Sequence, residues 1–404
     1  MSPDAYQFFE RELDDIKNNN NYRFLKTMQA RDGKHVTYRD KRYINLSSND
    51  YLGLASNAGM IREFYAGLND ANRLSLFGPG SSSSRLLAGD YPCYTELEME
   101  TATAYRDSIS ESGPPAQREA LVFTSGYHAN TGIIPALAGK GDIILSDRLN
   151  HASIVDGARL SRADYFVYGH LNYEELANIL DQKRDDYKKA LIVSESVFSM
   201  DGDIADIGRL AAIKKRFSAI LYLDEAHAFG VFGDRGLGIA DRDRTAGEID
   251  VIVGTFGKAL GGLGAFAVTA PVIKEYLINK ARPFIFTTAL PPVVVNWNLF
   301  ALRKLSAMKE QRAHLVRLSN RLRSSLAGMG LSTRGESQIV PAILGENEKA
   351  IRAAEKLQSS GFLVFPVRPP SVPQGSSRIR ISLRADLDQE DIYLIPEILR
   401  DLAP

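Results

Sequence analysis

Short apolar runs alternate with longer helix-like stretches between about residues 47 and 284. These runs lack a polar–apolar alternation and end in small or polar residues, which is typical of strands buried on both faces of a sheet. Because strand-like and helix-like segments follow one another in turn, we expect an α/β fold with a mostly parallel sheet. The predicted strands lie at residues 120–123, 142–146, 190–193, 220–223, 251–253 and 264–268.

The chain before this region is mostly polar. It predicts a short helix at residues 6–17 and then a hairpin, with strands at 35–38 and 42–45 joined by the turn at 39–41. Such a segment is too small for a hydrophobic core of its own. We therefore expect an arm and not a domain.

The chain after Pro291-Pro292 changes pattern again. A long helical stretch from residue 293 to about 329, broken once, precedes a mixture of strand-like and helix-like segments. The later elements are predicted near residues 338–344, 348–360, 362–365 and 378–382. We thus divide the chain into an N-terminal arm (1–46), a large domain (47–290) and a smaller C-terminal α+β domain (291–404). A polar segment at 107–119 contains Gly-Pro-Pro and predicts a surface loop.

Composition and charge narrow the possible functions. Lys plus Arg and Asp plus Glu number 49 each, so no excess positive charge favours binding to nucleic acid or to an anionic membrane. Cys93 is the only cysteine, which excludes an internal disulfide and is typical of a reducing compartment. Neither a secretory signal nor an apolar run of the roughly 18 residues that span a bilayer is visible. We expect a cytoplasmic protein without nucleic-acid or membrane partners.

Lys258 is the residue that points most directly to chemistry. It follows the apolar run 251–253 and lies among the glycines of residues 255–262, where backbone and ligand can approach closely. Taken alone, such a lysine is more often a plain surface residue. Together with the polar residues that follow the other predicted strands, it has the chemistry of a Schiff-base lysine for pyridoxal 5′-phosphate (PLP).

Those polar residues supply the other parts of a PLP site, because ligands bind beyond the carboxyl ends of parallel strands. Asp224 would pair with a protonated pyridine nitrogen, although a helix N-cap is the commoner use of such an aspartate. His227 can reach the ring oxygen, and His151 can stack on the ring; a structural histidine and a capping residue are the respective alternatives. The turn at 125–127 resembles a helix start that binds phosphate. Ser199 and Thr255 are hydroxyls near strand ends that can contact the ring oxygen or the phosphate.

The sequence Asp-Glu-Ala-His at residues 224–227 also occurs in certain helicases. A helicase requires Gly-x-x-x-x-Gly-Lys-[Ser/Thr] as well, to hold nucleotide phosphates. Around Lys258 the first glycine is replaced by Ile252 and the hydroxyl residue by Ala259, and no other Gly-Lys completes the motif. The six histidines and one cysteine show no metal-ligand spacing, so we expect no metal.

Five motifs in order and spacing resemble the α-oxoamine synthase family, PLP enzymes that join an amino acid to an acyl thioester with loss of carbon dioxide. They are residues 47–54, 150–153, 197–203, 224–227 and 255–258. The resemblance implies a fold type I (aspartate aminotransferase-like) large domain and a homodimer with its site at the interface. It also implies PLP contacts at Lys258, Asp224, His227, Ser199, His151, Gly126, Tyr127 and Thr255, with Thr287 or Thr288 reaching the neighbouring subunit's phosphate.

The resemblance also implies a substrate. Residues 367–373 and 378–383 are most similar to the members that make the biotin precursor from L-alanine and a pimeloyl thioester, on coenzyme A or an acyl carrier protein. By this resemblance Asn49, Arg23 and Ser371 contact substrate, and Arg368 is the partner of a substrate carboxylate. Two departures concern this part: serines at 81–84 where the family is glycine-rich, and Ser371 where threonine is typical.

Several alternatives remain at this point. The nearest is a family member that uses glycine and a short acyl-CoA, such as a glycine C-acetyltransferase, followed by one that uses a long acyl chain. An aminotransferase needs the same cofactor residues. A non-catalytic partner subunit with the same fold could lack the lysine, and the presence of Lys258, Asp224 and His227 argues against it.

Overall fold

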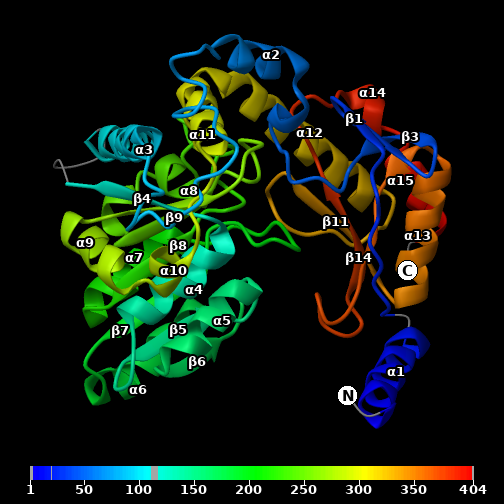
Figure 1. Ribbon diagram of the computed structural model, residues 1–404. Coiled ribbons are helices and arrows are strands. Elements are labelled where there is room, and N and C mark those ends of the chain that lie inside the picture. Colours follow the sequence, from blue (N-terminus) through cyan, green and yellow to red (C-terminus); the bar gives the residue numbers. More distant parts are fainter. Residues whose placement is uncertain (1–2, 20, 111–116, 403–404) are drawn as a thin grey trace. The chain divides into compact units, whose positions relative to one another are not determined.

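The computed structural model describes residues 3–19, 21–110 and 117–402, which group into two compact units. The first unit comprises the residues up to Ser48, Met200–Gly202 and the residues from Arg317 onward. The second unit comprises Asn49–Ser199 and Asp203–Val316. The second unit contains the large sheet, and the first contains two small ones (Figure 1).

A seven-stranded sheet forms the centre of the second unit, in the order β4-β10-β9-β8-β7-β5-β6. The strands from β9 to β6 in this order are parallel, and β10 is antiparallel to both β9 and β4. The predicted α/β fold with a mostly parallel sheet is confirmed. The strands are β4 (Glu119–Phe123), β5 (Ile143–Asp147), β6 (Asp164–Tyr168), β7 (Ala190–Glu195), β8 (Ile220–Asp224), β9 (Val251–Thr255) and β10 (Ala265–Thr269).

The edge strand β6 has no counterpart among the predicted strands. Tyr168 is its one buried residue, and the other four are exposed or partly exposed. An edge strand with one solvated face does not need a continuous apolar run. A search for such runs finds the buried strands and misses this one.

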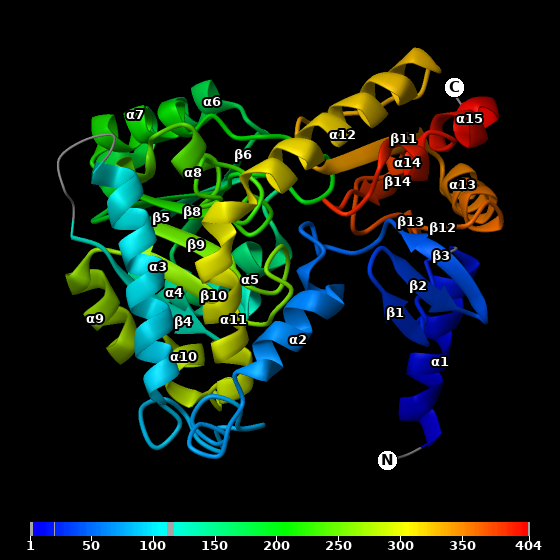
Figure 2. The same ribbon diagram turned by 90° about the horizontal axis from the view of Figure 1, so that it is seen from above.

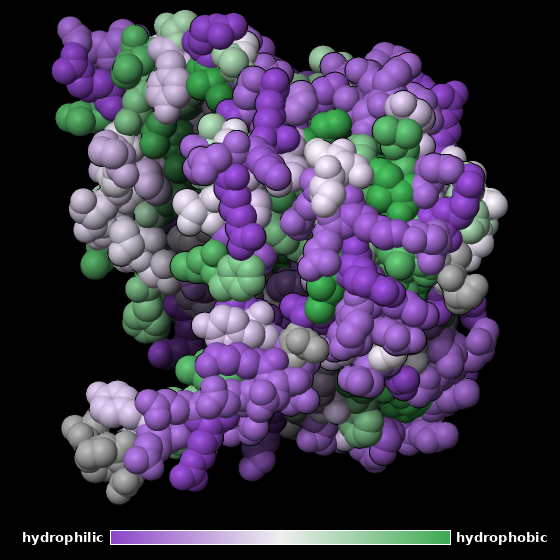
Figure 3. Space-filling model, turned by 90° about the vertical axis from the view of Figure 1, so that its right-hand side faces the viewer, coloured by the Kyte–Doolittle hydropathy of each residue, from purple (hydrophilic) through white to green (hydrophobic). Residues whose placement is uncertain are grey.

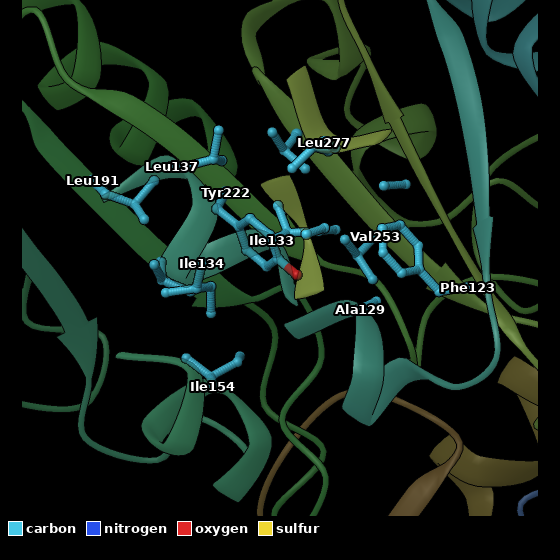
Figure 4. Close-up of a cluster of buried hydrophobic side chains, with 14 of the residues drawn as sticks. Phe123, Ala129, Ile133, Ile134, Leu137, Ile154, Leu191, Tyr222, Val253 and Leu277 are labelled. Atoms are coloured by element: carbon cyan, nitrogen blue, oxygen red, sulfur yellow. The ribbon is translucent and has the colours of Figure 1, made fainter. Parts of the chain in front are cut away.

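In the second unit, helices pack against the large sheet and form an apolar core with it. Figure 4 shows Ile133 and Ile134 of α4 packing with Leu191, Tyr222 and Val253 of the strands in a buried apolar cluster. The helices of this unit are α2 (Ala58–Ala66), α3 (Pro92–Ser110), α4 (Gly126–Leu137), α5 (Ala152–Ser161), α6 (Tyr173–Lys183), α7 (Ile207–Phe217), α8 (Ile239–Arg242), α9 (Pro271–Lys280), α10 (Arg282–Phe286) and α11 (Pro292–Leu305).

Residues 107–110 are helical, which corrects the loop predicted for 107–119. Helix α3 continues through them because Ile109 is buried and the Ser108 hydroxyl bonds to the Asp241 carboxylate. Strand β4 already begins at Glu119. Residues 111–116 of the predicted loop lie outside the described residues.

Figure 2 shows α3 beside α11, and Arg303 of α11 donates to two glutamates of α3.

The long helical stretch predicted after residue 293, with one break, is confirmed. Helix α11 is followed by a short 3₁₀ turn at Ser306–Met308 and by α12 (Lys309–Gly328). The chain passes from the second unit to the first within α12, between Val316 and Arg317. Further 3₁₀ turns lie at Leu54–Ser56, Arg184–Asp186, Ala246–Glu248 and Arg400–Leu402.

The first unit joins the N-terminal arm to the C-terminal part of the chain. The predicted hairpin forms as β2 and β3. Strand β3 also pairs in parallel with β12, so the arm (1–46) groups with the residues beyond 316. The sequence analysis had assigned the arm and residues 291–404 to separate parts of the chain. A second sheet has the order β11-β14-β13. The elements are α1 (Pro3–Asn18), β1 (Ala30–Asp32), β2 (His35–Tyr38), β3 (Lys41–Asn45), β11 (Ile339–Gly345), α13 (Asn347–Ser359), β12 (Phe362–Leu363), β13 (Pro366–Val367), β14 (Ser377–Ser382), α14 (Gln389–Ile392) and α15 (Ile395–Leu399).

The surface in Figure 3 is mostly hydrophilic, with hydrophobic residues scattered among the polar ones. Within the described part of the chain, no helix combines the length and the apolar character that crossing a membrane requires.

Gly254 offers a test of how tightly the sheet is packed near Lys258. It lies opposite Phe266 in the β9–β10 pair, and a Cβ at this position would overlap the Phe266 ring, which also packs on Phe256. We expect Gly254→Ala to lower the free energy of unfolding by about 1–3 kcal/mol, the usual cost of overpacking a core. Urea unfolding of purified protein measures the change.

The matched control is Gly139→Ala, because the nearest atom to a Cβ there is the Ser161 carbonyl oxygen at 3.8 Å. This variant should unfold at nearly the wild-type urea concentration. Equal midpoints for the two variants would contradict the packing argument.

Candidate active site

Four neighbouring parallel strands of the second unit end in polar residues. The last residues of β5, β7, β8 and β9 are Asp147, Glu195, Asp224 and Thr255. Glu195 and Asp224 are direct partners in the β7–β8 register. Because the carboxyl ends of parallel strands share one edge of the sheet, these side chains gather where such sheets bind ligands.

The Asp224 carboxylate is buried, with 5% of the residue exposed, and is held by two donors. Its Oδ2 accepts from the Asn130 side-chain amide at 2.8 Å, and its Oδ1 accepts from the Ala226 backbone N–H at 2.9 Å. The second bond closes a turn and not the first turn of an α-helix, so Asp224 is not the helix N-cap of the alternative interpretation. Two neutral donors orient the carboxylate without neutralising it, and a cation is needed to offset its burial.

Asn130 of α4 organises the surroundings of Asp224. Its Nδ2 also donates to the Ser153 hydroxyl at 2.8 Å, and its Oδ1 accepts from the Tyr222 hydroxyl. Asn130 is 1% exposed. A single amide therefore connects two helices to the strand that carries Asp224, a role that no sequence motif signalled.

Lys258 lies in the tight turn that follows β9. Its carbonyl oxygen accepts from the Gly261 N–H at 3.0 Å, and Gly261 has a φ of +64°, which favours glycine. The Lys258 side chain is partly exposed. Its positive charge lowers the pKa of both His151 and Glu195, so the ammonium lies within electrostatic reach of both.

Glu195 is a second buried carboxyl group at this edge, and the sequence analysis did not single it out. Desolvation raises the pKa of Glu195 well above its ordinary value, the neighbouring Asp224 raises it further, and Lys258 opposes the change. Its Oε1 has no hydrogen-bond partner among the described residues. The sequence shows only that an apolar run ends in Ser-Glu-Ser. It does not show that Glu195 lies beside Asp224 of the neighbouring strand.

His151 caps a helix, and its stacking on a cofactor ring stays a prediction. Its Nδ1 accepts from the Ser153 N–H at 3.2 Å and so caps α5, while the residue remains accessible to solvent. The Ser153 hydroxyl, which accepts from Asn130, lies 2.7 Å from the same nitrogen and is free to donate to it. We assign the ring proton to Nε2 on this basis. Desolvation by the surrounding protein lowers the pKa of His151, followed by the opposing effect of Asp224 and the lowering effect of Lys258.

His227 is buried and bonded to a residue from a distant segment. Its Nδ1 lies 2.7 Å from the Tyr51 hydroxyl, and that hydroxyl donates to Asn49 Oδ1 at 3.1 Å. Tyr51 is fully buried. The structure thus brings Asn49 and His227 into one network, and it adds Tyr51, to which the motif at residues 47–54 had given no role.

The candidate phosphate site is the start of α4. Ser125 caps this helix through the His128 N–H at 3.1 Å, and a Cβ on Gly126 would meet no atom within 4 Å, so open space lies over the helix start. The Tyr127 hydroxyl donates a hydrogen bond to the Asp156 carboxylate. The Thr255 hydroxyl donates to the Gly264 carbonyl at 2.9 Å and accepts from the Gly257 N–H at 3.2 Å.

Three further predicted residues lie elsewhere in the second unit. Ser199 is partly buried in the segment after β7. Thr287 and Thr288 follow α10, and Thr288 is exposed. The roles of these three residues stay predictions.

The three remaining substrate residues lie in the first unit, where the structure brings them together. Arg23 Nη2 lies 3.3 Å from Ser371 Oγ, although 348 positions separate the two in the chain. Burial lowers the pKa of Arg368, and the nearby Arg23 lowers it further. Lys26 was not predicted: burial lowers its pKa, Arg368 adds to this, and its ammonium lies 4.7 Å from the centre of the Phe365 ring.

No group of three or more His, Cys, Asp or Glu side chains that could hold a metal ion is found among residues 3–19, 21–110 and 117–402.

Known proteins resemble the chain along nearly its whole length. The family model described as aminotransferase class I and II matches residues 41–395. An 8-amino-7-oxononanoate synthase from Chlorobaculum parvum is 45% identical over 392 residues, which are 97% of this chain and 97% of that protein. A serine palmitoyltransferase variant from S. paucimobilis with bound PLP–myriocin has a TM-score of 0.85 at 30% identity, covering 99% and 97% of the two chains. An 8-amino-7-oxononanoate synthase from Francisella tularensis has a TM-score of 0.71 at 31% identity, covering 89% and 97%.

The residues of the second unit fit PLP. A protonated pyridine nitrogen would be a suitable cation for the buried Asp224 carboxylate, and Lys258 would provide the amine for the aldehyde. The open space over Gly126 leaves the N–H groups at the start of α4 accessible to a phosphate. His151 is accessible for stacking on a ring.

Asn130 provides a test of this fit that does not depend on turnover. We expect Asn130→Ala to weaken PLP affinity by about tenfold, because the loss of a hydrogen bond to a charged group costs on the order of 1.5 kcal/mol and leaves Asp224 poorly oriented. Fluorescence titration of PLP-free protein with PLP measures the dissociation constant.

Asn172→Ala is the control, since Asn172 caps α6 through the Glu175 N–H and has no bond to the site residues. It should bind PLP as the wild type does. An unchanged dissociation constant for Asn130→Ala would show that Asn130 does not support the cofactor site.

Proposed function

Because the chain belongs to the class I and II aminotransferase family and to its α-oxoamine synthase branch, we propose that it condenses L-alanine with a pimeloyl thioester. The products are 8-amino-7-oxononanoate, carbon dioxide and a free thiol, and the reaction belongs to biotin biosynthesis. The acyl carrier is coenzyme A or an acyl carrier protein. PLP is the cofactor.

One observation supports the reaction type above all others. Asp224 ends β8, Lys258 follows β9 and His151 follows β5, and the electrostatic effects of Lys258 and Asp224 meet at His151. A primary amine, a buried carboxylate and an accessible imidazole are the side chains that PLP chemistry on an amino acid needs. The choice of alanine and pimeloyl groups rests on the 45% identity to the Chlorobaculum parvum protein.

PLP, when bound, supplies an electron sink that stabilises negative charge at the α-carbon of an amino acid. Asp224 holds the ring nitrogen in its protonated form, because neutralising that nitrogen would leave a buried carboxylate without a cation. Lys258 Nζ, as a free amine, would take the proton from the alanine α-carbon. His227 and Ser199 serve the ring-oxygen side in this proposal, and the hydrogen bond between His227 Nδ1 and the Tyr51 hydroxyl fixes the His227 ring.

His151 serves the thioester in the same proposal. Its pKa is lowered, so the imidazole is neutral near pH 7, and Nδ1 is occupied as an acceptor. Nε2–H then remains as a donor for the thioester carbonyl oxygen, on which negative charge builds during attack by the α-carbon. A neutral donor leaves the adjacent Lys258 ammonium without added repulsion.

The cationic cluster of the first unit supports a dicarboxylic acyl chain. Burial lowers the pKa of both Lys26 and Arg368; in addition, Arg368 lowers the pKa of Lys26 and Arg23 lowers that of Arg368, so these positive charges are close together. An anion relieves this repulsion, and guanidinium groups bind carboxylates in a bidentate manner. L-Alanine and a pimeloyl group carry one free carboxylate each, whereas a palmitoyl group carries none.

A matrix of substrates tests the proposed reaction. Alanine, glycine and serine are each mixed with pimeloyl, acetyl, succinyl or palmitoyl thioester, and free thiol is measured with PLP-loaded protein. We expect thiol release with alanine and the pimeloyl thioester at a rate at least about tenfold above the other pairs, because the relative that is 45% identical to this chain is named 8-amino-7-oxononanoate synthase.

Release with glycine and a short acyl group would change the assigned substrates but not the assigned catalytic residues. Release with serine and palmitoyl thioester would favour the activity of the serine palmitoyltransferase relatives. Conversion of bound PLP to its amine form without any thioester would indicate transamination and contradict the proposal.

We further propose a homodimer in the cytoplasm, with the active site at the subunit interface. Thr288 is exposed in its own chain, in keeping with a contact to the neighbouring subunit's phosphate. Cys93 is buried, and burial raises the pKa of its thiol to about 11, as expected for an unreactive cysteine in a reducing compartment.

Mixing two inactive variants tests the shared site. Lys258→Ala should abolish turnover and the visible absorbance of lysine-bound PLP, and the double change Thr287→Ala with Thr288→Ala should reduce activity strongly. After unfolding and refolding together in equal amounts, the mixture should regain about a quarter of the wild-type activity, because half of the dimers then contain one intact site. No gain on mixing would show that these threonines serve their own subunit or none.

A further inference from the structure

His170 lies between two carboxylates in the second unit and belongs to none of the motifs discussed above. Its Nδ1 is 2.9 Å from Asp147 Oδ1, and its Nε2 is 3.1 Å from Asp203 Oδ2. The three residues come from different parts of the chain: Asp147 ends β5, His170 follows β6, and Asp203 lies in the segment between β7 and α7. One imidazole therefore bridges two segments at the carboxyl edge of the sheet.

Both ring nitrogens face carboxylate oxygens, which accept but do not donate hydrogen bonds. Both nitrogens must then carry protons, and the ring is an imidazolium. The His170 side chain is 20% exposed and Asp147 is 1% exposed, so solvent screens the pair with Asp147 little. The Phe198 ring meets the imidazole edge to face, with 4.5 Å between the ring centres.

The charge of His170 persists above neutral pH. Burial lowers its pKa, but hydrogen bonds and ion pairs with Asp147 and Asp203 outweigh burial and raise the pKa to about 9. Tyr168 and Tyr173 also lie near Asp147; burial and Asp147 raise their pKa values, so both are neutral here. Glu175 accepts from the N–H of Gly169, the residue before His170, at 2.7 Å. Two carboxylates and one imidazolium thus leave a net charge of −1.

Asp147 fixes the segment that leads to His151. Besides His170, its Oδ1 accepts from the Leu149 N–H at 2.8 Å and its Oδ2 accepts from the Leu171 N–H at 2.8 Å. His151 lies four positions after Asp147 in the chain. The position of His151 relative to the sheet depends on this anchored turn.

Asp203 fixes the segment that carries Ser199. Its carbonyl oxygen accepts from the Phe198 N–H at 3.0 Å, and Val197 and Ile204 form a β-bridge around it. Ser199 follows Phe198 directly. The carboxylate of Asp203 is the group through which His170 reaches this segment.

We propose that His170 is a positioning residue that, as an imidazolium held between Asp147 and Asp203, ties the segment of His151 to the segment of Ser199. This inference rests on the proposed function, because His151 and Ser199 matter only as cofactor and substrate contacts. His170 itself does not contact the reacting atoms. Deprotonation above about pH 9 removes one of its two bonds and loosens both segments together.

The test compares His170→Gln with Asp203→Asn and a distant control. Glutamine keeps a donor but no charge, so PLP should still bind, with kcat for alanine and the pimeloyl thioester lowered about tenfold or more by misplacement of the site. In Asp203→Asn the imidazole loses one counter-charge, its pKa falls, and the alkaline limb of kcat should move to lower pH by about one unit.

Three readouts keep the inference separate from the identity of the substrate. In PLP-free protein, the C–H proton signal assigned to His170 by its loss in His170→Gln should titrate near pH 9 in the wild type and lower in Asp203→Asn. In PLP-loaded protein without substrates, the pH at which the visible absorbance changes should shift in both variants. The wild type should also lose thermal stability as pH rises through about 9, because a raised pKa stabilises the folded protein only while the group is protonated.

His35→Gln is the control, since His35 lies in the first unit and burial lowers its pKa. It should leave the absorbance and the alkaline limb unchanged. A wild-type kcat and absorbance profile in His170→Gln would overturn the proposal. A loss of thermal stability in His170→Gln with normal kcat in the folded fraction would reduce His170 to a structural role. If the spectroscopic shifts occur but no thioester reacts, the proposed substrates fail and the positioning role stands.

Discussion

The buried carboxylate of Asp224 is the constraint on which the rest of the site depends. An ionised carboxylate at 5% exposure is costly unless a cation meets it, and its two hydrogen-bond donors here are neutral groups. The sheet places the carboxylate at its carboxyl edge, so the compensating cation must come from a ligand or from Lys258. A protonated pyridine nitrogen would satisfy this demand, and the carboxylate would then hold the ring in the form that withdraws electrons. In the proposed site, one ion pair would link the stability of the fold to the reactivity of the cofactor.

Much of this site is predictable from the chain because it follows strand ends. Apolar runs predict β5, β7, β8 and β9, and the residues just beyond them include Asp224, Lys258 and His151. Asn130, Glu195 and Tyr51 were not predicted, because each acts through a neighbour that is distant in the sequence: Asn130 is 94 positions from Asp224, and Tyr51 is 176 from His227. Their residue types carry no signal of their own, since any helix of an α/β protein can contain an asparagine.

The same reasoning explains why some of the predicted helices, strands and loops were wrong or missing. Strand β6 is half solvated and lacks the apolar run of its neighbours, and α3 continues into polar residues because Ile109 packs inward. The arm and the C-terminal part share a sheet through the β3–β12 pair, which two buried residues, Phe362 and Leu363, provide. Pairing between a strand of two residues and one more than 300 positions away leaves no trace in local periodicity. Arg23 and Ser371 lie close together in the first unit, and only the family resemblance had singled them out.

The carboxyl edge of the sheet contains acids in two different settings. Asp147 and Asp203 share the His170 imidazolium, which bonds to both carboxylates and so holds two backbone segments. Glu195 is buried beside Asp224; burial and the neighbouring Asp224 raise the pKa of Glu195 well above its ordinary value, and Lys258 opposes the change. The first pair of acids has its cation within the protein, whereas Glu195 and Asp224 lie where Lys258 and a bound cofactor would supply the positive charge. The two settings are joined at His151, whose backbone segment begins at Asp147 and whose ring is acted on in opposite directions by the charges of Asp224 and Lys258.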